Sequence, residues 1–254
     1  MSAENEFYDN PEVRTNYLAR RACPDNPNDT LERPLFLELA GDLTHLDIID
    51  LGCGDAAFGK AALLQGARSY EGIEVSQAMV DLAYQTLAGT SGNIRHEKIE
   101  MWRSQEKQVD LVTSRLALHY VENLKPVFQE IYKALRLGGR VIVSVEHPVI
   151  TSNFASLAEG RRTSWLVDNY FKAGARVHKW LGHEVTKYHH TLEDYFVLIT
   201  DTGFELEFIK ESRPQRGNFL NQKEYERRLR IPLFLFIAAR KSNVILSQNS
   251  GKKT

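Results

Sequence analysis

The sequence predicts an α/β fold in which a parallel sheet is covered by helices on both faces. Between residues 47 and 145, short apolar segments of strand length alternate with segments of helical spacing. Strands that alternate with helices of this size form parallel sheets covered on both sides. Two further observations support this class: a glycine-rich turn joins the first strand to a helix, and two apolar strands close the chain before residue 241.

Length and composition limit the functional classes. The chain has 254 residues, of which 43% are hydrophobic and 26% charged, enough for one large domain with a sizeable core. A net charge of -1 provides no overall attraction to nucleic acid or to an anionic membrane. Two cysteines, an acidic N-terminus unlike a signal peptide and the absence of an apolar run of about 20 residues predict a cytoplasmic, soluble protein.

Residues 1–45 are expected to form a helical leader or lid. Asn10 or Pro11 opens a predicted first helix that runs to Arg20, and a second runs from Thr30 to Ala40. The intervening stretch is rich in proline and asparagine and predicts a loop, while Gly41 ends the second helix.

The alternating core follows in residues 46–240. The predicted strands are Asp47–Leu51, Ser69–Glu74, Ile94–Ile99, Val109–Ser114 and Arg140–Val145. The predicted helices between them are Phe58–Gln65, Ser76–Leu87 and Leu124–Leu135. The alternation resumes with a helix over Thr191–Thr202 and strands over Phe204–Ile209 and Pro232–Ala239. Residues 241–254 are expected to be a flexible tail.

Residues 147–193 interrupt this rhythm and are expected to form an inserted cap over the carboxyl edge of the sheet. They contain no long apolar strand, but they hold five of the eight histidines and several aromatic residues. These aromatic residues are Phe154, Trp165, Tyr170, Phe171, Trp180 and Tyr188. Aromatic side chains over an expected pocket suggest a hydrophobic or aromatic small substrate.

The glycine turn and a downstream acid indicate an adenosine-type cofactor. Gly52 and Gly54 follow the first strand, and Glu74 ends the second strand 20 residues after Gly54, where a carboxylate can bind ribose hydroxyls. Asp50 precedes the turn, and an acid there suits a ligand with a cationic amine and repels a pyrophosphate.

Several ordered motifs resemble those of class I S-adenosylmethionine-dependent methyltransferases: Ile48–Gly59, Glu74, Val109–His119 and Leu135–Val145. Within that family, Asp110–Tyr120 is similar to small-molecule methyltransferases of the ubiquinone-biosynthesis type, and Ser144–Pro148 is similar to a bacterial subgroup. The resemblance implies a Rossmann-like, seven-stranded sheet with an antiparallel last strand. It also implies S-adenosylmethionine as cofactor, with S-adenosylhomocysteine as product.

The resemblance assigns a set of cofactor contacts. Glu74 would bind the ribose, Glu100 would accept from the adenine amino group where the family usually has Asp, and Met101 would offer its N–H and an apolar side. The full expected set is Tyr8, Asp50, Gly52, Cys53, Gly54, Glu74, Val75, Glu100, Met101, Ser114 and Leu116. Tyr8, Tyr17 and Arg20 of the leader are expected to close over the cofactor.

Methyl transfer from a sulfonium needs alignment and exclusion of water, and it needs a base only if the nucleophile arrives protonated. His119 and His147 are the candidate bases, because they follow the fourth and fifth strands at the edge where such sheets bind ligands. The expected substrate-binding residues are His147, Trp165, Tyr170 and His189. Cap histidines and Glu146 could ligate a metal, but they lack the spacing of a zinc site, so no metal is expected.

Three alternatives stay open. An RNA methyltransferase is disfavoured by the net charge and by the absence of an Asn/Asp-Pro-Pro-aromatic motif after the fourth strand. A nicotinamide oxidoreductase is disfavoured by Asp50 and by the C-terminal strand pair. A non-catalytic cofactor-binding protein is the third. The preferred partner is a small molecule, with neither a membrane nor nucleic acid; the sequence leaves the N-, O- or C-nucleophile and the oligomeric state open.

Overall fold

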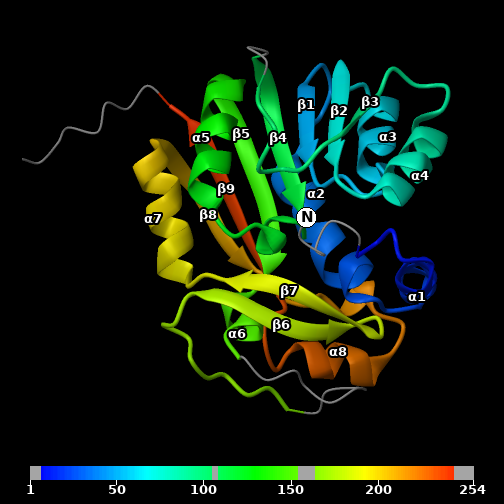
Figure 1. Cartoon of the computed structure of the whole chain (residues 1–254), viewed down its shortest axis with the longest axis vertical. Helices are drawn as coiled ribbons and strands as arrows, with labels where there is room; N and C mark the ends of the chain where they lie inside the picture. The colour runs from blue at the N-terminus through cyan, green and yellow to red at the C-terminus, as the bar shows by residue number, and fades with distance from the viewer. Residues whose placement is uncertain (1–6, 105–107, 154–163, 243–254) are drawn as a thin grey trace, which may run out of the picture.

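A seven-stranded sheet forms the centre of the molecule in the computed structural model, which describes residues 7–104, 108–153 and 164–242 (Figure 1). Its strand order is β3-β2-β1-β4-β5-β9-β8. The strands are β1 (Asp47–Leu51), β2 (Ser69–Glu74), β3 (Asn93–His96), β4 (Val109–Arg115), β5 (Leu135–Glu146), β8 (Phe204–Glu211) and β9 (Phe234–Lys241). Strands β1 to β5 pair in parallel, and β9 pairs antiparallel with both β5 and β8. The predicted Rossmann-like sheet with an antiparallel last strand is therefore confirmed.

Helices cover both faces of the sheet because successive strand residues point to opposite sides. Ile49 and Leu51 of β1 pack with α5 (Leu124–Ala134) and α7 (Leu192–Thr202). Ile48 packs on the other face, with residues from four helices. These four are α2 (Arg33–Ala40), α3 (Ala57–Leu64), α4 (Gln77–Leu87) and α8 (Gln222–Arg228).

The segment expected to form a cap contains a β-hairpin that the sequence analysis did not predict. It consists of β6 (Gly174–Trp180) and β7 (His183–His189), which pair only with each other, and it follows the short helix α6 (Pro148–Thr151). The inward side chains of this hairpin include Arg176, Lys187 and His189, all buried. Polar residues on the buried face remove the apolar alternation by which strands are recognised.

The hairpin lies across the end of the sheet at which β4 and β5 finish, and α1 (Pro11–Ala22) lies beside its tip (Figure 1). The predicted first helix is present, with Asn10 as its N-cap. The predicted second helix is divided into a π-helical turn at Asn28–Glu32 followed by α2. The short 3-10 helices η3 (Leu118–Tyr120) and η4 (Arg216–Asn218) complete the fold.

Some expectations fall beyond this description. Phe154 and nearly all of the expected tail, residues 243–254, lie outside the described residues. Among the helices that are described, none combines the length and the apolar character needed to cross a lipid bilayer.

No side chain fits at Gly59 in α3, because a tyrosine ring packs directly against it. A Cβ at Gly59 would lie 2.2 Å from Cζ of Tyr70, whose hydroxyl donates to Asp50 at 2.9 Å. We expect Gly59→Ala to lower the free energy of unfolding by about 1–3 kcal/mol, because overpacking outweighs the gain in helix propensity. Urea denaturation measures this change. Gly217→Ala, where a Cβ meets nothing within 4 Å, is the matched control and should leave the midpoint unchanged.

Candidate active site

A cavity of about 870 Å³ lies between the glycine turn after β1 and a roof formed by residues 7–22 and the β6–β7 hairpin. Its floor comes from the ends of β1, β2, β4 and β5, where ligands bind in open α/β sheets. Four of the expected cofactor residues meet there: Asp50, Gly52, Gly54 and Glu74. The cavity continues from this floor towards η3 and the hairpin.

The two glycines of the turn serve different purposes. Both have positive φ, +73° at Gly52 and +58° at Gly54, a backbone region that favours glycine. A Cβ at Gly52 would lie 2.3 Å from Cβ of Ala117, so this glycine allows the turn to pack against the chain after β4. A Cβ at Gly54 would meet nothing within 4 Å, which leaves the space beside this peptide open for a ligand.

Glu74 joins the glycine turn to the loop after β2. Its Oε2 accepts from the N–H of Gly54 at 2.9 Å, and its Oε1 accepts from the N–H groups of Val75 and Ser76 at 3.0 Å each. Burial raises the pKa of Glu74, while these three backbone bonds act in the opposite direction. A carboxylate has about four acceptor positions, so one remains for a ribose hydroxyl.

Asp50 is buried, and its carboxylate holds two neighbouring strands. Oδ1 accepts from Oγ1 of Thr113 on β4 at 2.8 Å, and Oδ2 accepts from the hydroxyl of Tyr70 on β2 at 2.9 Å. Burial raises the pKa of Asp50, although the two hydroxyl bonds and Arg115 counteract it. An acid at this position places negative charge directly beneath the glycine turn.

The loops after β2, β3 and β4 provide the next wall of the cavity. Val75 of the first loop, Ile99 and Glu100 of the second and Leu116 of the third line it. Leu116 has φ +52°, a strained value for this residue type, and its N–H donates to the carbonyl of Ser144 at 2.9 Å. Cys53 also lines the cavity, and burial raises the pKa of its thiol well above the usual range.

The structure corrects two expected cofactor contacts. Met101 is 61% exposed and does not line the cavity. Ser114 is fully buried, and its Oγ donates to the carbonyl of Leu51 at 2.8 Å, so it joins β4 to β1. Side chains alternate along a strand, and the position of Ser114 in β4 directs its hydroxyl to the neighbouring strand.

His119 lines the cavity at η3 but is poorly suited to act as a base. Its Nδ1 accepts from the N–H of Glu146 at 3.4 Å, an arrangement that leaves the proton on Nε2. Burial lowers the pKa of His119 to about 3. The side chain is therefore neutral at pH 7, and it is a hydrogen-bond donor at Nε2.

A buried ion pair between Glu146 and Lys187 lies beside His119. Nζ of Lys187, on β7, is 2.5 Å from Oε1 of Glu146, the last residue of β5. Burial alone would raise the pKa of Glu146, but Lys187 and His119 bring it down to about 2. Both residues line the cavity and neither was assigned to the site from the sequence, because their pairing depends on the unpredicted hairpin.

His147 is structural, which corrects the expectation that it is a base or a substrate contact. It does not line the cavity, and both ring nitrogens are occupied. Nε2 donates to Oε1 of Glu211 at 2.9 Å, and Nδ1 accepts from the N–H of Val149 at 3.2 Å, which caps α6. Burial lowers its pKa, while Glu211 acts in the opposite direction.

Of the other expected substrate residues, Trp165 lines the cavity, whereas Tyr170 and His189 do not. His189 is fully buried; it donates to the carbonyl of Tyr170 at 2.8 Å and accepts from Thr151 at 2.7 Å. The contacts of Tyr170 and His189 hold the segment before the hairpin in place. The expectation that these two residues bind the substrate is therefore corrected, because they stabilise the inserted segment itself.

The roof is held by contacts from the leader. Asp9 accepts from Oγ of Ser76 at 2.7 Å and from the N–H of Ala78, at the start of α4. Nδ2 of Asn16 donates to the carbonyl of Leu181 at the hairpin tip, and the guanidinium of Arg20 lies 4.3 Å from the ring centroid of Trp180. The three expected leader residues, Tyr8, Tyr17 and Arg20, all line the cavity.

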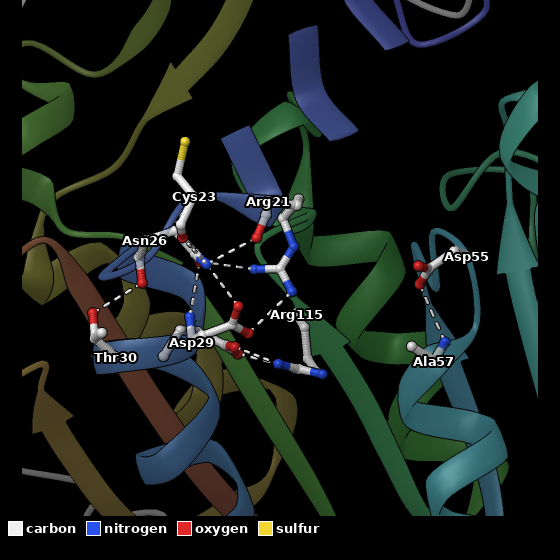
Figure 2. Close-up of polar contacts among 9 residues, drawn as sticks. Arg21, Cys23, Asn26, Asp29, Thr30, Asp55, Ala57 and Arg115 are labelled. Carbon is white, nitrogen blue, oxygen red and sulfur yellow. Dashed lines mark hydrogen bonds and ion pairs between the residues drawn. The ribbon is translucent and has the colours of Figure 1, made fainter. Parts of the chain in front are cut away.

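A polar cluster fixes the loop after α1 beside the end of β4 (Figure 2). Arg21 contacts Oδ1 of Asn26 at 3.1 Å and Oδ1 of Asp29 at 3.2 Å. Below this cluster, Arg115 forms a bidentate ion pair with Glu32, a residue that the sequence analysis did not single out. Glu32 is 1% exposed, and its ion pair with Arg115 and a hydrogen bond from Oγ of Ser144 at 2.8 Å compensate for the burial of this acid.

No group of three or more His, Cys, Asp or Glu side chains arranged for a metal ion occurs within the described ranges.

Comparisons with known proteins agree with this geometry. Residues 49–143 match the family model described as a methyltransferase domain. The chain is 31% identical to an S-adenosylmethionine-dependent methyltransferase of Mesorhizobium loti, covering 82% of this chain and 97% of that one at a TM-score of 0.75. It is 28% identical to a proposed S-adenosylmethionine-dependent methyltransferase of Listeria monocytogenes, covering 83% and 96% at the same TM-score. An uncharacterised Haemophilus influenzae protein is 28% identical over 95% of this chain and 99% of its own.

We expect Glu74→Gln to weaken adenosylhomocysteine binding at least tenfold, or about 1.4 kcal/mol. The amide nitrogen of Gln would face a backbone N–H donor, which disturbs the turn and removes the charged acceptor. Isothermal titration calorimetry measures the affinity, with circular dichroism confirming that the variant is folded. Glu122→Gln, at an exposed position outside the cavity, is the control. Equal affinities for the two variants would remove Glu74 from the site.

The neutral state of His119 predicts a loss of stability in acid. Its pKa in the folded chain, about 3, lies below the ordinary value of 6.5, so the unfolded chain binds more protons between these values. Stability attributable to His119 is complete above pH 6.5 and is lost as the pH falls towards 3.

Between pH 7.5 and pH 5, the free energy of unfolding should fall by about 2 kcal/mol more in the wild type than in His119→Asn. Asn keeps an acceptor near Nδ1 but does not titrate. Urea midpoints at the two pH values provide the measurement. Identical slopes in the wild type and in His119→Asn would contradict the prediction.

Proposed function

The chain belongs to the S-adenosylmethionine-dependent methyltransferases, and we propose that it transfers a methyl group to a small-molecule acceptor. The observation that carries this proposal is the continuation of the cavity beyond the cofactor turn. There it becomes a roofed chamber lined by Tyr8, Tyr120, Glu146, Trp180 and Lys187. The whole cavity, at about 870 Å³, lies within the range of small-molecule sites.

The residues at the floor of the cavity fit the cofactor. Glu74 would bind its ribose, the open space at Gly54 would admit it close to the backbone, and Asp50 would provide negative charge near its cationic amine. When bound, S-adenosylmethionine supplies an electrophilic methyl group on a sulfonium leaving group. The chain's own part is then to hold an acceptor in line with that methyl group and to exclude water.

The roof supports this role. It brings α1 and the β6–β7 hairpin over the cavity through Arg20 and Trp180, and through a carbonyl of the hairpin tip that accepts from Asn16. Tyr8 and Tyr120 line the cavity beneath it, and burial raises the pKa of both hydroxyls, so they are protonated donors at pH 7. Together with a neutral His119, they provide donors that orient an acceptor.

Incubation with S-adenosylmethionine labelled in its methyl group tests the proposal. We offer the protein a deproteinised small-molecule extract and, separately, total RNA. Label should appear in compounds below about 1 kDa, since the cavity volume is typical of small-molecule sites. The Glu74→Gln variant is the negative control for cofactor binding. Label in RNA with none in the small-molecule fraction would overturn the proposal.

A further inference from the structure

We propose that the acceptor carries an anionic group, a carboxylate or a phosphate, and that Arg20 and Lys187 bind this group in the roofed chamber. The inference rests on the proposed function, because it specifies the class of small molecule that the chamber accepts. It is drawn from the positions of the charged side chains around Trp180.

Two cations lie against the same indole ring. The guanidinium of Arg20 is 4.3 Å from the ring centroid of Trp180, and Nζ of Lys187 is 5.2 Å from it. Nζ of Lys187 is also 5.8 Å from the ring centroid of Tyr120. All four residues line the cavity. The ring of Trp180 therefore contacts both positive groups, at an energy of about 0.5–2 kcal/mol for each contact.

Only one of these two cations forms an ion pair with an acidic residue among the described residues. Lys187 is paired with Glu146, whereas Arg20 forms no ion pair with an acidic residue in the part of the chain that the structure describes. Its planar guanidinium has five N–H donors in a fork that fits a carboxylate or a phosphate. Arg20 is exposed, so an anion that enters the cavity can reach its guanidinium.

Acidic and basic side chains both line the cavity. Asp50 and Glu74 lie beneath the expected cofactor, and Lys187 pairs with Glu146. Arg20 of α1 and Arg227 and Arg228 of α8 add positive charge to the lining. An anionic acceptor would be attracted to these arginines and repelled by Asp50 and Glu74.

A cationic acceptor fits this chamber poorly. Aromatic rings can receive an ammonium group, but Trp180 already contacts Arg20 and Lys187. The second tryptophan of the lining, Trp165, has the guanidinium of Arg230 at 5.1 Å from its ring centroid. The carboxylate of Glu146 is likewise engaged by Lys187. A positive acceptor would therefore meet like charges where an anion meets donors.

Binding of four matched probes tests the inference on protein saturated with adenosylhomocysteine. The probes share one ring and differ in the attached group: benzoate, phenyl phosphate, benzylamine and benzyl alcohol. Isothermal titration calorimetry should show that at least one anionic probe binds tenfold or more tightly than benzylamine and benzyl alcohol. Comparison of benzoate with phenyl phosphate distinguishes a carboxylate from a phosphate.

On protein saturated with adenosylhomocysteine, Arg20→Gln should weaken the anionic probe at least fivefold. Arg14→Gln, on the same helix but outside the cavity lining, is the control and should bind as the wild type does. Arg20→Lys should recover part of the affinity, because it restores the charge without the fork.

Equal or tighter binding of benzylamine, no anion preference, no binding of any probe at 20 mM, or full anion binding by Arg20→Gln would each overturn the inference. Failure here is separable from failure of the proposed function. A chain that methylates a neutral or cationic small molecule in the labelling experiment retains the proposed function and refutes only the anionic acceptor.

Discussion

The site depends on one buried carboxylate that accepts hydrogen bonds from three backbone N–H groups. Glu74 joins Gly54 of the first loop to Val75 and Ser76 of the second, and it would leave both loops with unpaired buried donors if it were removed. Asp50 does the same between neighbouring strands through two hydroxyls. Acids that hold the walls of the cavity are thus also the acids nearest the expected cofactor. The same two carboxylates therefore fix the geometry of the cavity floor and provide its negative charge.

The sheet could be predicted from the sequence because its signals are local. A buried strand such as Asp47–Leu51, a glycine turn after it and a helix behind it follow one another within 20 residues, and each has a recognisable pattern. The same holds for the helix predicted over Thr191–Thr202, which begins at a capping box formed by Thr191 and Asp194. The floor of the cavity consists of these local features, so motif and spacing predicted residues that line it: Asp50, Gly52, Gly54 and Glu74.

The ion pairs that line the cavity could not be predicted in the same way, because they join residues far apart in the chain. Lys187 meets Glu146, and Arg115 meets Glu32, across 41 and 83 residues. His147 illustrates the reverse error: its position after β5 was correctly identified, but a partner 64 residues away, Glu211, engages its ring. Sequence position places a residue at the edge of the sheet, but the fold decides whether its side chain faces the cavity.

The hairpin over the cavity forms a two-stranded sheet of its own, without a hydrogen-bonded ladder to the central seven strands. Substitutions and changes of length in β6 and β7 therefore need not alter the register of the strands that support the glycine turn. The hairpin and the strands below it can therefore change independently during evolution. Under the proposed function, descendants of such a chain can acquire new acceptors through changes in the hairpin while the expected cofactor residues stay in place.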